Sequence, residues 1–69
     1  SQGKGTRVDL AESVQWYRKS ADQGYKEAQL ALARCYENGR GVPKDYSQAA
    51  YWYRKAGDEE AAKRCEAKV

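Results

Sequence analysis

Apolar residues recur at helical spacing in four stretches of the chain, and glycine or proline separates these stretches. In the first stretch, four residues at i, i+4, i+7 and i+11 share one helical face: Leu10, Val14, Tyr17 and Ala21. Asp9 precedes this run as an N-cap, and Gly24 follows it as a breaker. The pattern therefore predicts a helix that starts at Asp9 and ends near Asp22.

A second helix is predicted from about Lys26 to Glu37, before the terminating pair Asn38-Gly39. Its apolar stripe consists of Ala28, Ala31, Leu32, Cys35 and Tyr36. The segment 39–44 has two glycines and Pro43, so we expect a sharp turn there and not a helix.

Two further helices are predicted in the last third of the chain. Asp45 caps the third, whose buried face consists of Tyr46, Ala49, Ala50, Tyr53 and Ala56. The fourth runs from Asp58 or Glu59 to about Ala67, and Cys65 falls at a core position. Because its outer face is polar, at Glu60, Lys63 and Lys68, we expect a terminal capping helix near 58–68.

The chain also repeats itself. Trp16-Tyr17-Arg18-Lys19 returns as Trp52-Tyr53-Arg54-Lys55, 36 residues later, and the same shift maps Gly3 onto Gly39 and Gly5 onto Gly41. Such a period indicates stacked helical units. The prediction is an all-α fold, an α/α superhelix (solenoid) of about two helical-hairpin repeats and four helices. Residues 1–69 would form a single repeat domain, with the first repeat incomplete.

Composition narrows the possible functions. The net charge is +3, and the basic and acidic residues are interspersed along the chain. No run of like charge exceeds three residues, which argues against a nucleic-acid-binding tail. No apolar stretch is long enough to span a membrane, and no signal peptide is apparent. Because the chain opens on the loop half of a repeat, we expect it to be a fragment of a longer protein. Its localisation stays open.

The residues for cofactor or catalytic chemistry are sparse. Without histidine, Cys35 and Cys65 cannot complete a zinc site or a nucleophile–base pair, so we expect no metal, no cofactor and no enzyme activity. The two cysteines are either free thiols or a disulfide. Each Gly-x-Gly loop precedes an aspartate, Asp9 or Asp45, whose carboxylate would repel a bound phosphate.

The run from Leu32 to Asp45, continued by Ala49-Ala50-Tyr51-Trp52-Tyr53-Arg54-Lys55-Ala56, resembles the Sel1-like repeat. Residues 3–28 match the second part of that pattern again. The family is a relative of the tetratricopeptide repeats and forms α/α solenoids. The resemblance implies a protein–protein interaction module or scaffold, with a protein or peptide partner and no small-molecule substrate. Ala33 departs from the pattern, which has glycine there.

The first helix of each solenoid hairpin lines the concave side, and the predicted second helix occupies that place. Candidate partner-binding residues are those outside its apolar stripe and at its start: Tyr25, Lys26, Gln29, Ala33, Arg34 and Glu37. The alternative is that these residues form an ordinary solvated face. An apolar stripe at the open end of the stack could also pair with a second copy.

A nucleic-acid-binding module is the alternative from another class. It would use a basic ridge of Arg18, Lys19, Arg54 and Lys55, with bases stacking on the adjacent aromatic rings. Aromatic residues beside alanines at helical spacing more often pack between helices, so we expect Trp16, Tyr17, Trp52 and Tyr53 to be packed. A third possibility is a spacer or cap without a partner of its own.

Overall fold

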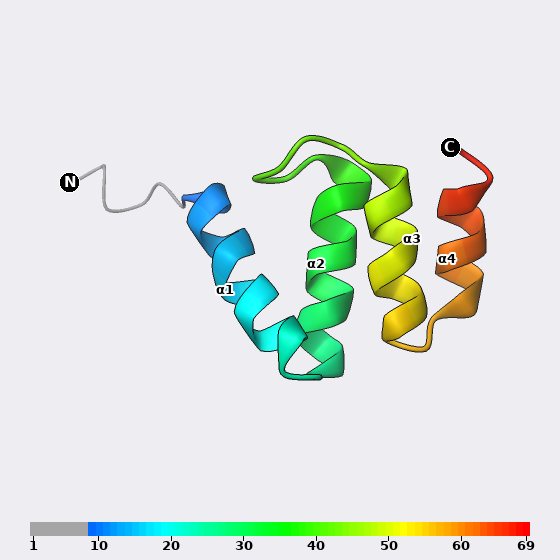
Figure 1. Ribbon diagram of the computed structural model, residues 1–69. Coiled ribbons are helices and arrows are strands. Elements are labelled where there is room, and N and C mark those ends of the chain that lie inside the picture. The colour runs from blue at the N-terminus through cyan, green and yellow to red at the C-terminus, as the bar shows by residue number, and fades with distance from the viewer. Residues whose placement is uncertain (1–8) are drawn as a thin grey trace.

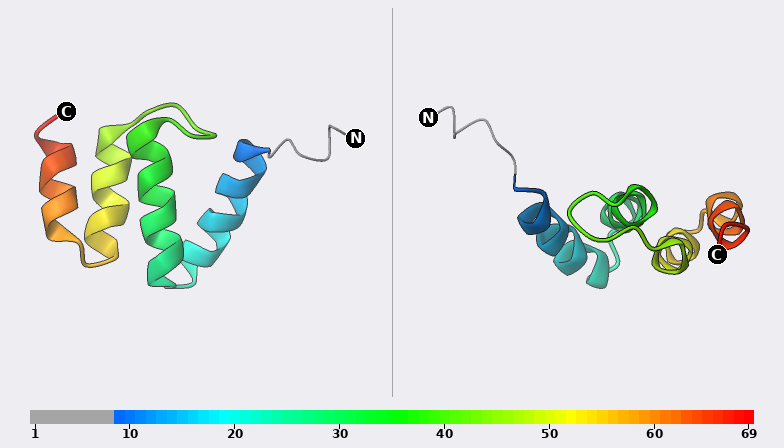
Figure 2. Two further views of the ribbon diagram at one scale, coloured as in Figure 1. Left: turned by 180° about the vertical axis from the view of Figure 1, so that it is seen from behind. Right: turned by 90° about the horizontal axis from the view of Figure 1, so that it is seen from above.

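The computed structural model describes residues 9–69 as four helices without strands: α1 (Leu10–Asp22), α2 (Lys26–Asn38), α3 (Tyr46–Lys55) and α4 (Glu59–Glu66). Figure 1 shows the helices side by side in chain order, each next to its neighbour in sequence. Seen from above, α2 and α4 lie to one side of α3 (Figure 2). The predicted all-α solenoid is confirmed. Gly3 and Gly5 lie outside the described residues.

Aspartate side chains begin three of the four helices. The backbone N–H of Glu12 donates to Asp9 (3.3 Å), that of Gln48 to Asp45 (3.2 Å) and that of Ala61 to Asp58 (3.1 Å). The predicted caps at Asp9 and Asp45 are therefore confirmed. These carboxylates satisfy first-turn N–H groups that have no partner within the helix.

The turn between α2 and α3 packs on the start of α1, as Figure 1 shows. Gly39 and Gly41 both have positive φ, at 69° and 80°. A Cβ atom at Gly41 would lie 2.5 Å from the carbonyl oxygen of Leu10 and 2.9 Å from Cγ2 of Val14. Glycine is thus required at position 41 both by the backbone conformation and by this close approach.

About half of the core residues are alanines, and the others are larger side chains. These alanines are Ala21, Ala33, Ala49, Ala50, Ala61 and Ala62. Leu32 and Cys65 are the largest side chains that are completely buried, which confirms the core position expected for Cys65. Small residues let neighbouring helices pack closely, so the helices form a thin row.

The two Trp-Tyr pairs differ in burial. Trp52 and Tyr53 are 5% and 4% exposed, whereas Trp16 and Tyr17 are 61% and 39% exposed. The expectation that all four rings are packed is thus wrong for Trp16 and only partly right for Tyr17. The reason is position in the row: α3 packs against both α2 and α4, while α1 packs mainly against α2.

Candidate functional site

An open groove of about 380 Å³ lies between α1 and α2. We call it the α1–α2 groove, and it is lined by Leu10, Ser13, Tyr17, Ala31, Arg34, Cys35, Asn38 and Arg40. The lining combines apolar side chains with hydrogen-bonding groups and two cations. Such a mixture can contact both the apolar and the polar parts of a partner.

The α1–α2 groove carries unbalanced positive charge. No carboxylate lines it, and the exposed guanidinium groups of Arg34 and Arg40 form no ion pair or side-chain hydrogen bond within residues 9–69. Arg54 and Arg64, by contrast, both bind carboxylates. Two cations on one groove are therefore available to a ligand.

Cys35 is a buried free thiol in the lining of this groove. Burial raises the pKa of Cys35, and the nearby positive charge of Arg40 opposes that rise only in part. The group is therefore a neutral thiol at pH 7, and it does not cancel the charge of the two arginines.

Three of the candidate residues predicted from the sequence are exposed. Arg34 lies in the α1–α2 groove, whereas Tyr25 and Lys26 lie at the opposite end of α2, where the helix begins. The structure thus does not bring these three side chains into a single patch.

Gln29 and Ala33 are buried, so the prediction that they lie on the open face of α2 is wrong. The Nε2 atom of Gln29 donates to the carbonyl oxygen of Ala21 over 3.2 Å, which connects α2 to the last turn of α1. Ala33 is completely buried in the core. Because α2 packs against both α1 and α3, its buried face is wider than the apolar stripe alone indicates.

Glu37, the sixth candidate, joins three helices. Its Oε1 accepts a hydrogen bond from the Tyr53 hydroxyl at 2.7 Å, and Arg64 donates to its Oε2 at 2.8 Å. Partial burial acts to raise the pKa of Glu37, but these hydrogen bonds outweigh burial and the pKa lies below its ordinary value. Burial and the bond to Glu37 raise the pKa of Tyr53 to about 12. Glu37 thus connects α2 to α3 and α4.

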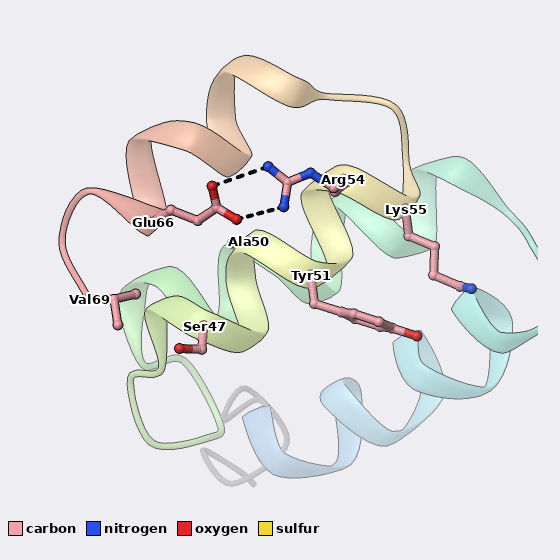
Figure 3. Close-up of a pocket in the computed structure, with 7 residues that line it drawn as sticks. All are labelled: Ser47, Ala50, Tyr51, Arg54, Lys55, Glu66 and Val69. Atoms are coloured by element: carbon pink, nitrogen blue, oxygen red, sulfur yellow. Dashed lines mark hydrogen bonds and ion pairs between the residues drawn. The ribbon is translucent and has the colours of Figure 1, made fainter.

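A second hollow, of about 630 Å³, lies along α3 and the end of α4 (Figure 3). Its one arginine is already paired: Arg54 binds Glu66 through two hydrogen bonds of 2.6 and 3.2 Å and also contacts Glu59 at 3.2 Å. Although this hollow is larger, its lining contains both Arg54 and its counter-ion Glu66, and its second cation, Lys55, lies over the ring of Tyr51. It is therefore less suited than the α1–α2 groove to recognise a charged partner.

The predicted basic ridge is partly occupied by internal contacts. Arg54 binds two carboxylates, and Arg18 donates to the hydroxyl of Tyr36. The ammonium groups of Lys19 and Lys55 lie over the rings of Trp16 and Tyr51, at 5.1 and 5.8 Å from the ring centroids. The four cations therefore do not form a continuous set of free charges.

Sequence reasoning missed most of the α1–α2 groove. The sequence pattern places Leu10 and Tyr17 on one face of the first helix, Ala31 in the apolar stripe of the second, and Arg40 in a turn. Their shared surface arises because α1 and α2 diverge toward the α2–α3 loop (Figure 1), and the periodicity of one helix cannot show that. Within residues 9–69 there is no cluster of three or more potential metal ligands, and no helix is long and apolar enough to cross a membrane.

Comparison with protein families gives two matches to the Sel1 repeat, at residues 1–25 and 26–60. Comparisons with curated proteins and with solved structures give no match. The second match contains both α2 and α3, and the first ends immediately before α2. With these repeat boundaries, α2 is the first helix of the second repeat, and α1 is the second helix of the preceding repeat.

Proposed function

Since the chain belongs to the Sel1 repeat family, whose helical repeats are typical of protein-interaction modules, we propose that it binds a partner protein or peptide along the α1–α2 groove. The observation that carries this proposal is the groove itself. It combines exposed aromatic and aliphatic surface with two arginines that have no ion-pair partner in the described part of the chain, whereas the hollow beside α3 and α4 contains an internal ion pair.

The mechanism is passive capture by a preformed surface. Three features hold α1, α2 and the α2–α3 loop in place. They are the Asp9 cap of α1, the close contact of Gly41 with α1, and the hydrogen bond from Gln29 to Ala21. A groove already formed before binding requires little backbone rearrangement, so less ordering entropy is lost on association. A short segment of the partner can then insert its side chains between the two helices.

The test is a comparison of two matched substitutions in the full-length protein. Ala31→Gln places a larger neutral side chain inside the α1–α2 groove, and Ser47→Gln does the same in the hollow beside α3. Both sites are helical, so circular dichroism should show unchanged helix content. We expect proximity labelling to lose the wild-type partners with Ala31→Gln and to keep them with Ser47→Gln.

Equal partner sets for the wild type and Ala31→Gln would refute the proposal. Sedimentation velocity measures the oligomeric state and so tests whether a second copy of the chain occupies the groove. A dimer that Ala31→Gln converts to a monomer would assign the α1–α2 groove to self-association. Loss of partners in both variants would show that the effect is not specific to this groove, and it would also count against the proposal.

A further inference from the structure

We infer that the segment bound in the α1–α2 groove is acidic, and that its Asp or Glu carboxylates pair with Arg34 and Arg40. This inference rests on the proposed function and adds the chemistry of the partner. It follows from a contrast among the arginines of α2, α3, α4 and the loop. Arg54 and Arg64 bind carboxylates of this chain, while Arg34 and Arg40 bind none within residues 9–69.

Two carboxylates that flank groove residues in sequence are already in use. Asp9 accepts the N–H of Glu12 at the start of α1, and Glu37 is held by Tyr53 and Arg64. Neither belongs to the lining of the α1–α2 groove. Within residues 9–69 no carboxylate lines the groove or pairs with either guanidinium group, so an external carboxylate would supply the missing counter-ion.

Guanidinium groups suit this role because each can donate two parallel hydrogen bonds to one carboxylate. The apolar lining at Leu10, Tyr17 and Ala31 then favours a partner in which aliphatic residues accompany the acidic ones. A nucleic acid fits less well. Its backbone needs a track of cations, and the basic residues on the neighbouring helices bind internal groups, as Arg18 and Arg54 do.

The experiment is a fluorescence anisotropy titration of the full chain with three labelled probes. These are a synthetic peptide of repeated Glu-Ser-Leu units, the same peptide with Gln for Glu, and an oligothymidylate of the same net charge. We expect the Glu peptide to bind more tightly than the other two. Arg34→Gln and Arg40→Gln should each weaken its binding about fivefold, the usual upper range for one exposed ion pair. Lys63→Gln, an exposed charge change on α4, is the matched control and should leave binding unchanged.

Thiol labelling gives an independent readout at the same surface. Bound Glu peptide should slow the reaction of Cys35 with iodoacetamide, because Cys35 lines the α1–α2 groove. Cys65, which is completely buried elsewhere in the core, serves as the internal reference.

Three results would overturn the inference: no binding of the Glu peptide at millimolar concentration, equal binding of the Gln peptide, or equal weakening by Lys63→Gln. Tighter, arginine-dependent binding of the oligothymidylate would assign the groove to nucleic acid instead. The experiments also distinguish failure of this inference from failure of the proposed function. If this inference alone fails, partner labelling would still be lost with Ala31→Gln but would survive Arg34→Gln and Arg40→Gln.

Discussion

The hydroxyl of Tyr53 on α3 donates a 2.7 Å hydrogen bond to the carboxylate of Glu37 on α2. The same carboxylate accepts a hydrogen bond of 2.8 Å from Arg64 on α4. One acidic side chain therefore connects three helices that otherwise share an alanine-rich core. Because alanine faces are smooth, directional polar contacts of this kind help to define the register of the stack.

Tyr53→Phe should destabilise the fold by about 1–2 kcal/mol, since it removes a partly buried hydrogen bond to a charged acceptor. The matched control is Tyr17→Phe at the equivalent position of the preceding repeat. The Tyr17 hydroxyl makes no hydrogen bond to another residue in 9–69, so its loss should be nearly neutral. Urea denaturation measures both changes, and equal costs would contradict this account of Glu37.

The same contact predicts a loss of stability in alkali. The pKa of Tyr53 is raised from 10.0 to about 12, so between these values the unfolded chain has released a proton that the folded chain retains. The contribution is complete below pH 10 and is lost as the pH rises towards 12, with a magnitude of about 3 kcal/mol.

The informative quantity is a difference between two proteins, because every titratable group except Tyr53 is common to both. The free energy of unfolding should fall more steeply with pH in the wild type than in Tyr53→Phe. Parallel pH dependences in the two proteins would show that Tyr53 keeps an ordinary pKa.

Much of the fold follows from local signals in the sequence. Asp9 and Asp45 act as the predicted caps, and the glycines at 39 and 41 form the predicted turn. Local signals fail where burial depends on neighbouring helices. Trp16 and Trp52 have the same sequence context, yet only Trp52 is covered, because α3 has helices on both sides. The α1–α2 groove was missed for the same reason, since its lining comes from two helices and a loop.

Gly41→Ala should be the most damaging alanine substitution among the glycines of the turns. Its Cβ would meet the Leu10 carbonyl oxygen at 2.5 Å, in addition to the strain of a positive φ. Gly24→Ala is the control, because φ is also positive there but no atom lies within 4 Å of the added carbon. We expect a cost of about 1 kcal/mol at Gly24 and about 3 kcal/mol at Gly41 by urea denaturation. Similar losses of stability in the two variants would show that the α2–α3 loop is not in close contact with α1.

Trp52→Ala should cost about 3–5 kcal/mol, as expected for removal of a buried aromatic ring, whereas Trp16→Ala should change stability by less than about 0.5 kcal/mol. Trp52→Phe should cost less than Trp52→Ala, because it keeps an aromatic ring and removes an Nε1 donor that is buried without a partner in residues 9–69. Thermal denaturation ranks the three variants, and acrylamide quenching of the Trp52→Phe protein reports Trp16 alone. Strong quenching is expected from its 61% exposure.

Weak quenching of Trp16, or a large loss of stability in Trp16→Ala, would mean that the outer face of α1 is covered, most simply by a second copy of the chain.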